Sequence, residues 1–178
     1  MKIFILTILL TIPYSLLSQE LQTLKKVEAG INGLAYSWEI PATEKITIEP
    51  AIGLGQSCNI TSKMIWYWDL LDPSLHISAY GKLFYNRDKR LEKGKSLLNN
   101  SGHFIGIKIK YVSTPYWYPE YFSNTLLTNF NWGGQFNLGK HWQYSYSLGF
   151  GYGRNLDNPY VMFYPAFDVK IAYILPLK

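Results

Sequence analysis

The sequence contains little of what most metal sites and helical membrane proteins require. Cys58 is the only cysteine, which excludes an intramolecular disulfide framework. His76, His103 and His141 are the only histidines, and they are too scattered to suggest a metal site. Beyond residue 17 no apolar run is long enough for a membrane helix, and the mean hydropathy is −0.06. We therefore expect no metal and no cofactor, and the helical class of membrane protein is excluded.

Charge is also sparse, whereas aromatic residues are abundant. Charged residues make up 16% of the chain, and 17 Lys and Arg against 12 Asp and Glu give a formal net charge of +5. This mild excess suits anionic lipid headgroups and does not call for nucleic acid. Aromatic residues reach 17%, with 15 Tyr and 6 Trp, which is typical of chains that place amphipathic rings at a membrane interface. A sugar-binding protein could share this composition.

The first residues form a targeting signal. Lys2 supplies the positive charge, and Ile3–Leu17 is an almost unbroken apolar run that is too short for a comfortable membrane span. Ser18 precedes the expected cleavage site, and an uncleaved anchor is the alternative. We predict a signal peptide over residues 1–18 and a mature domain over residues 19–178, located beyond the inner membrane.

The stretch Trp142–Gly153 carries the clearest structural signal. Large apolar or aromatic residues alternate with small or polar ones, and a strand turns successive side chains to opposite faces. The same alternation predicts seven strands: Glu28–Ile40, Ile46–Gly55, Leu71–Tyr85, His103–Ser113, Asn124–Asn137, Trp142–Gly153 and Val161–Leu175. Single-chain bacterial barrels have an even number of strands, so we expect eight. The missing strand lies in Leu21–Val27 or in Cys58–Trp68.

Polar residues occupy the strand faces opposite the apolar ones: Glu49, His76, Lys108, Lys110, Asn129, Asn131, Asp168 and Lys170. The apolar faces carry so many Tyr and Trp residues that they would make a poor dry core, since each polar tip needs a partner. At the two interfaces of a bilayer these tips reach water. We predict an all-β, antiparallel, up-and-down transmembrane β-barrel with tight turns at one end and a filled interior in which the charges pair. A soluble, secreted barrel of the lipocalin type is an alternative.

His76 is a weak candidate for catalysis. It could act with a serine such as Ser74, Ser78, Ser145 or Ser147 and be oriented by Glu49 or Asp168, as in a barrel enzyme that modifies lipid A or phospholipid. No spaced motif supports this, and a narrow interior needs small residues in any case, so we expect these residues to be structural. Gly149, Gly151 and Gly153 are expected to relieve crowding inside a curved sheet, because no helix follows to make a phosphate loop.

Two connections stand out. The segment Asn86–Gly102 is the most charged piece of the chain and predicts a turn or a helix of one to two turns. The loop Thr114–Ser123 is crowded with aromatics, which we interpret as an extension of an aromatic girdle, with a ligand-contacting surface as the alternative.

Part of the sequence is similar to a known group of proteins. The run from Leu83-Phe84-Tyr85-Asn86 through Lys89-Arg90 and Lys93-Gly94-Lys95 to Asn99-Asn100-Ser101-Gly102 resembles small, uncharacterised outer-membrane β-barrel proteins of Bacteroidota-type bacteria. The turn Leu138–His141 and the strand around Gly149–Tyr152 also resemble them. The resemblance implies location and fold, and no activity. One departure is that this chain ends in Leu175-Pro176-Leu177-Lys178 rather than in the aromatic residue that barrel-assembly machinery recognises.

These observations together predict a small barrel of the cell outer membrane with a structural or surface-interaction role. We expect a monomer whose partners are outer-membrane lipids, lipopolysaccharide and the barrel-assembly machinery, and which does not bind nucleic acid. The tight turns, including the basic one, should face the periplasm, and the aromatic loops should face the exterior.

Overall fold

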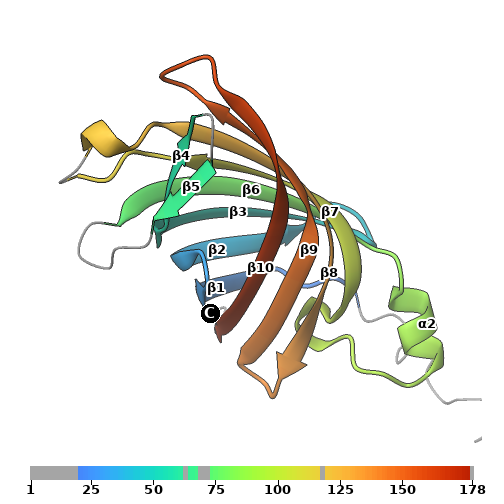
Figure 1. The fold of residues 1–178 in the computed structure, drawn as a ribbon. Coiled ribbons are helices and arrows are strands. Elements are labelled where there is room, and N and C mark those ends of the chain that lie inside the picture. Colours follow the sequence, from blue (N-terminus) through green and yellow to red (C-terminus); the bar gives the residue numbers. More distant parts are fainter. Residues whose placement is uncertain (1–19, 62–63, 68–72, 117–118, 177–178) are drawn as a thin grey trace, which may run out of the picture.

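The computed structural model describes residues 20–61, 64–67, 73–116 and 119–176. Within these residues, eight antiparallel strands close into a barrel (Figure 1), in the order β1-β10-β9-β8-β7-β6-β3-β2. The barrel strands are β1 (Leu24–Gly30), β2 (Gly33–Pro41), β3 (Ile46–Gly55), β6 (Ser74–Phe84), β7 (Gly102–Val112), β8 (Thr125–Leu138), β9 (Trp142–Asn155) and β10 (Val161–Leu175). The predicted signal peptide lies outside the described residues. None of the helices that the structure describes combines the length and the apolar character needed to cross a membrane.

Consecutive barrel strands pair with one another, and β1 pairs with β10 to close the sheet. This up-and-down order puts the connections at two ends. The turn end carries residues 42–45 and 139–141 and the segment between β6 and β7. Of the described residues, the loop end carries 31–32, 56–61, 64–67, 73, 113–116, 119–124 and 156–160. Within the loop end, β4 (Ser57–Ile60) and β5 (Met64–Tyr67) form a two-stranded hairpin outside the closed sheet.

The structure corrects the first predicted strand. Glu28–Ile40 is not one strand, because the chain reverses at Ile31-Asn32 between β1 and β2. Gly30 and Gly33 face each other across this turn, and Gly33 has a φ of +119°, which a side chain would strain. The eighth strand therefore begins within the predicted range Leu21–Val27. The other candidate, Cys58–Trp68, supplies the β4–β5 hairpin as far as Tyr67.

The turns are also distributed differently from the prediction of tight turns at one end. The shortest turn, Ile31-Asn32, lies at the loop end, and the basic segment at the turn end is not a tight turn. It contains α2 (Arg87–Glu92) and the 3-10 helix η2 (Leu98–Asn100), so the prediction of a short helix there is confirmed. The predicted strand Leu71–Tyr85 begins at Ser74 as β6, and Leu71 and Asp72 lie outside the described residues.

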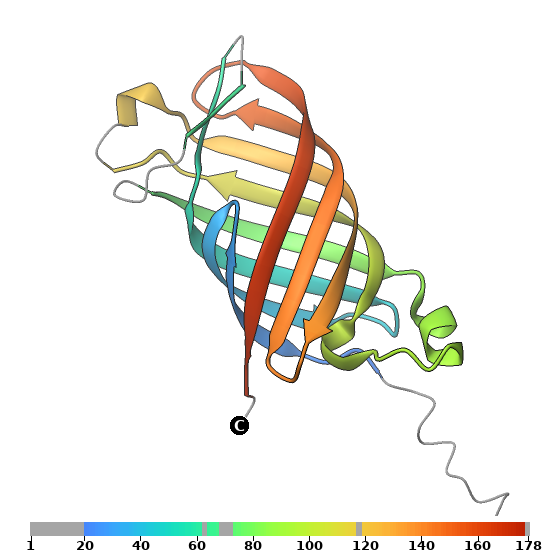
Figure 2. The ribbon, with the colours of Figure 1, turned by 60° about the horizontal axis from the view of Figure 1, so that its bottom comes forward.

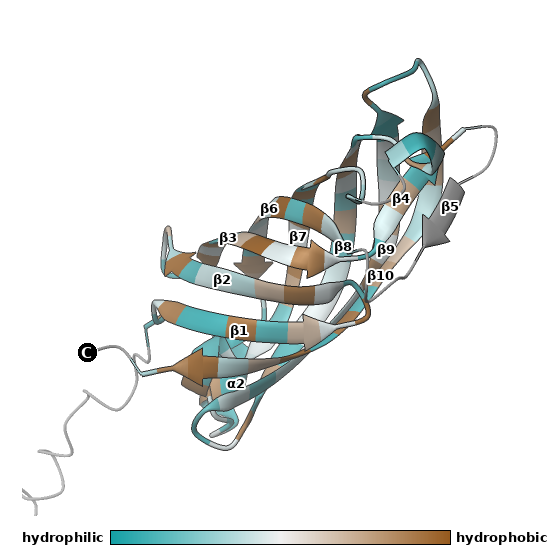
Figure 3. Ribbon diagram, turned by 90° about the vertical axis from the view of Figure 1, so that its left-hand side faces the viewer, coloured by the Kyte–Doolittle hydropathy of each residue, from teal (hydrophilic) through white to brown (hydrophobic). Residues whose placement is uncertain are grey.

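The large apolar side chains of the strands point outward, as predicted. Leu148 is 56% exposed and Phe150 is 72% exposed, whereas Ile107 and Ile109 lie on the same outer face at 46% and 49%. The rings therefore do not meet across the interior. Brown and teal residues alternate along β1, β2 and β6 (Figure 3), which is the pattern of strands with one apolar and one polar face. The interior is polar, and its buried members include Lys26, Glu39, Glu49, Lys82, Gln135 and Gln143.

Candidate functional site

The 3-10 helix η2 closes the interior at the turn end. Asn99 and Asn100 adopt left-handed backbone conformations, with φ angles of 54° and 56°, which Asn tolerates better than most residues. Their carbonyl oxygens accept hydrogen bonds from the side chains of two interior glutamines, at 2.6 Å from Gln143 Nε2 and 3.1 Å from Gln135 Nε2. The segment is thus tied to the barrel wall as a stopper.

Next to this stopper lies a cluster of three lysines and three glutamates, here called the ion network: Lys26, Glu28, Glu39, Glu49, Lys82 and Lys170. Lys26 Nζ lies 2.8 Å from Glu39 Oε2 and also contacts Glu49. Lys82 Nζ lies 2.7 Å from the same Glu49 oxygen, Oε2. Lys170 Nζ lies 2.7 Å from Glu28 and 3.0 Å from Glu49 Oε1. Each charge of the ion network therefore has an opposite partner, as burial requires.

The prediction that the interior charges pair is confirmed for Glu49, Lys108, Asp168 and Lys170 but not for Lys110, which forms no ion pair with the described residues. The prediction also named only part of the network. Glu49 and Lys170 were expected on the inner face, whereas Lys26, Glu28, Glu39 and Lys82 were not recognised. The sequence does hold a signal for them. Once the Ile31-Asn32 turn separates β1 from β2, Lys26 and Glu28 flank outward-facing Val27 in the same alternation that defines the other strands.

The hairpin strand β4 closes the interior at the loop end. Cys58 and Ile60 of β4 are almost completely buried, and Asn155 Nδ2 donates to the Ile60 carbonyl at 2.8 Å. They pack with inner-face residues of the barrel in the loop-end cluster: Cys58, Ile60, Val112, Leu127, Tyr164 and Ala166. Burial raises the pKa of the Cys58 thiol to about 12, while the charge of Lys110 acts in the opposite direction.

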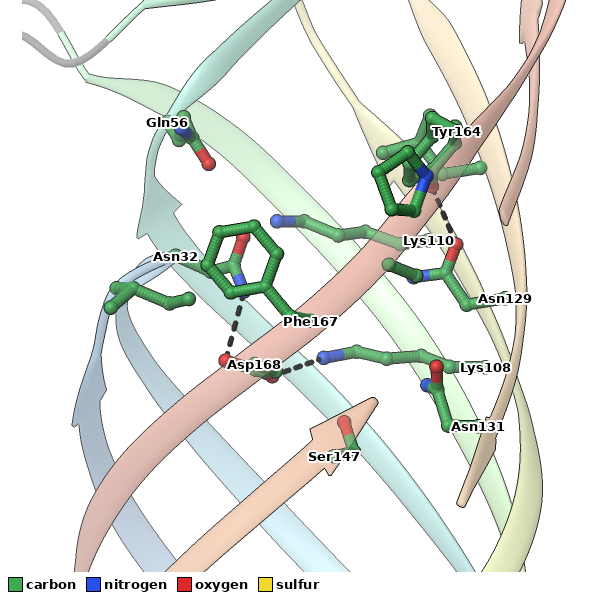
Figure 4. Close-up of a pocket in the computed structure, with 14 residues that line it drawn as sticks. Asn32, Gln56, Lys108, Lys110, Asn129, Asn131, Ser147, Tyr164, Phe167 and Asp168 are labelled. Atoms are coloured by element: carbon green, nitrogen blue, oxygen red, sulfur yellow. Dashed lines mark hydrogen bonds and ion pairs between the residues drawn. The ribbon is translucent and has the colours of Figure 1, made fainter. Parts of the chain in front are cut away.

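A cavity of about 300 Å³ remains between the ion network and the loop-end cluster (Figure 4). On its polar side, Asp168 Oδ2 lies 3.2 Å from Lys108 Nζ, and its other oxygen accepts a hydrogen bond from Asn32 Nδ2 at 2.9 Å. Tyr164 donates a short hydrogen bond of 2.5 Å to Asn129. Lys110 extends from β7 towards the side of the cavity formed by Asn32, Gln56 and Phe167, as Figure 4 shows.

The cavity lies along the edge of β10 that β1 leaves unpaired. Alternate residues of β10 point to opposite faces, yet both inward-facing Ala166 and Asp168 and outward-facing Pro165 and Phe167 line it. The pairing with β1 ends at Lys170, whereas β10 continues to Val161 with β9 as its neighbour (Figure 2).

The backbone of β10 agrees with this open edge. The Val169 carbonyl accepts a hydrogen bond from Ile31 N–H, so the backbone groups of Val169 point to the edge of β10 away from β9. Every second residue of a strand points its backbone groups to the same edge, so those of Pro165 also point away from β9. Proline has no N–H to leave unpaired, and this is the position that it tolerates in a strand. The opening is therefore compatible with the local sequence.

His76 faces the interior as predicted, but its surroundings are not those of a catalytic triad. Its buried Nδ1 has no hydrogen-bond partner in the described part of the chain. Ser74 Oγ is paired with Ser57 Oγ at 2.7 Å, and Glu49 and Asp168 are engaged by lysines. The described residues include no group of His, Cys, Asp and Glu side chains that could hold a metal ion.

Gly149 lies against the backbone of β8 at Phe130, and Gly151 and Gly153 lie against bulky side chains, so all three relieve crowding as expected. A Cβ on Gly151 would overlap the Tyr164 ring, and one on Gly153 would come within 2.5 Å of Ile60 Cδ1. They make room for the loop-end cluster.

Comparison with known proteins adds no name to this geometry. No family model, curated protein or solved structure matches the chain.

Proposed function

We propose that this protein is an integral β-barrel of the outer membrane that does not form a pore and has a structural or surface-interaction role. The observation that carries the proposal is the inverted distribution of polarity. Large apolar side chains cover the outside of every barrel strand, whereas lysines and glutamates fill the inside. A bilayer can surround the apolar outer side chains, and a closed barrel lets the charged inner side chains pair with one another.

Aromatic residues at the turn end support the same proposal. Trp132, Phe136 and Tyr146 form contiguous ring contacts on the outer face, with Trp142 and Tyr173 paired nearby. Trp132 Nε1 donates to Tyr85 Oη at 2.7 Å. Such rings suit the headgroup depth of a membrane, where an apolar ring meets lipid and its polar tip meets water.

The two alternatives fit the geometry less well. A soluble lipocalin-type barrel would bury its apolar residues inside, whereas Phe163, Phe150 and Phe167 here are between 63% and 79% exposed. An enzyme acting on lipid A or phospholipid would need a nucleophile within reach of its base, and the described residues give His76 Nδ1 no such partner.

Fractionation of cells expressing the full chain tests the proposal. We expect the mature protein in the outer-membrane fraction, resistant to alkaline carbonate extraction and soluble only in detergent. Its migration in a denaturing gel should shift on boiling, because a closed barrel resists the detergent until heated. Recovery in the aqueous fraction without detergent would refute the membrane location.

A further inference from the structure

On the inner face of the barrel strands, lysines outnumber carboxylates. Four carboxylates, Glu28, Glu39, Glu49 and Asp168, face five lysines: Lys26, Lys82, Lys108, Lys110 and Lys170. The ion network uses three of each, and Asp168 pairs with Lys108. Lys110 is left over. Lys110 is 4% exposed, and it forms no ion pair with a carboxylate of the described residues.

A lysine that lines a cavity without a carboxylate partner can hold its proton best when an anion enters beside it. Lys110 does not point into the ion network. Its amine lies towards the open side of the cavity, between Gln56 and the pair Asn32 and Phe167 (Figure 4). An anion that enters past the edge of β10 would therefore meet this charge first. We propose that the cavity binds the anionic headgroup of a single-chain amphiphile, with Lys110 as its counter-ion.

The rim of the cavity specifies the rest of the ligand. Ile31 and Phe167 are 39% and 63% exposed, and Pro165 lies beside Phe167 on the same outer face. A volume of about 300 Å³ is at the small end of ligand pockets, so it takes a headgroup and the start of a chain. The rest of the ligand's acyl chain would pass over Phe167 towards the bilayer, and this route rests on the membrane location proposed above. The headgroup contact does not.

The two ends of the barrel exclude other routes. The loop-end cluster and η2 fill the interior above and below, so the ligand approaches from the side rather than along the axis. A cationic headgroup would meet Lys110, and Asp168, the carboxylate that lines the cavity, is already paired with Lys108. A neutral headgroup would bring no opposite charge to Lys110.

Photo-cross-linking tests the proposal. The full mature chain is placed in phosphatidylcholine nanodiscs with a decanoate that carries a diazirine, and labelled peptides are mapped by mass spectrometry. We expect labels near Ile31 and on β10 between residues 163 and 167. Unlabelled decanoate and decyl phosphate should compete, and their ratio shows whether a carboxylate or a phosphate headgroup is preferred. Decanol should not compete.

Variants separate the charge from the fold. Lys110→Met should reduce labelling at least about tenfold, because the variant loses a charge-assisted hydrogen bond to the headgroup. Lys110→Arg should restore most of it, and Lys93→Met, at an exposed position at the turn end, should change nothing. The heat-dependent gel shift checks that each variant is folded.

Three results would overturn the proposal. They are equal labelling of Lys110→Met and wild type, competition by decanol as strong as by decanoate, and no saturable labelling at all. Competition by inorganic phosphate as strong as by decyl phosphate would remove the acyl chain from the proposal. The same competition in neutral maltoside detergent does not depend on membrane location, so its outcome is separate from that of fractionation.

Discussion

Lys26 lies at the centre of the ion network, with no part of its side chain exposed and three glutamates within 3.4 Å of its Nζ. Desolvation opposes burial of this ammonium, and only its three carboxylate neighbours make the position tolerable. Lys45, by contrast, pairs with Asp88 at 2.6 Å on the surface, where both side chains are largely hydrated. The two lysines form similar ion pairs in very different environments.

Replacing each with methionine should separate the two cases. Lys26→Met leaves Glu39 and Glu49 with an excess of buried negative charge, so we expect a loss of about 3–5 kcal/mol in the free energy of unfolding. Lys45→Met should cost less than about 1 kcal/mol, as for other exposed pairs. Urea unfolding in lipid vesicles, followed by tryptophan fluorescence, measures both. Equal losses for the two variants would mean that the network contributes no more than a surface pair.

Lys110→Met should have the opposite sign to Lys26→Met. It removes a buried charge that has no carboxylate partner among the described residues, and it keeps most of the side-chain volume. The unfolding midpoint in the same urea assay should be unchanged or higher than that of the wild type. A midpoint as low as that of Lys26→Met would show that Lys110 is paired after all.

At the scale of elements, contacts of β4 anchor the β4–β5 hairpin to the barrel. Ile60 fills the space over Gly153, and Ser57 bonds to Ser74. Cys58 lies between these contacts and is buried. Its thiol therefore reports on whether the hairpin is closed.

We expect Cys58 to resist maleimide at pH 8 in the folded protein and to react at once in urea. A raised pKa leaves little thiolate at that pH, and burial blocks the reagent. Ile60→Asp should release the hairpin and expose the thiol without unfolding the barrel, whereas Leu156→Asp, at an exposed loop position, should not. The same shift makes the closed state less stable as the pH rises from about 9 towards 12. Rapid labelling of the folded wild type would contradict this arrangement.

The strands could be predicted because alternation is a local property. The predicted strand Ile46–Gly55 coincides with β3. The predicted strand Trp142–Gly153 begins where β9 begins, and β9 continues to Asn155. The Ile31-Asn32 turn was missed because apolar and small residues continue the pattern through it. The partners of Glu49 could not be predicted, since they come from β1, β6 and β10 and meet only when the sheet closes. For the same reason, the lack of a partner for Lys110 becomes visible only after every other charge is placed.

At the scale of the whole molecule, the interior has no continuous axial path through the described residues. The loop-end cluster, the ion network and η2 succeed one another along the axis. We expect planar bilayers containing the purified protein to show no conductance steps above those of protein-free bilayers. Stable, single-size steps would show that the plugs open.

The orientation of the proposed membrane barrel can be tested with single cysteines, because buried Cys58 should give no background. Glu120 in the loop-end helix η3 (Pro119–Tyr121) and Lys95 at the turn end are both exposed. A membrane-impermeant maleimide added to intact cells should label Glu120→Cys and leave Lys95→Cys unlabelled until the outer membrane is permeabilised. The reverse pattern would place the turn end outside.

Closure of the barrel also joins distant parts of the chain. Lys170 reaches Glu28 across 142 residues, and Gln143 reaches Lys26 across 117. A partly assembled sheet would thus contain glutamates without their lysine partners until the last strand pairs. These unpaired charges destabilise every partly closed sheet. Assembly should therefore pass through few stable intermediates between the open sheet and the closed barrel.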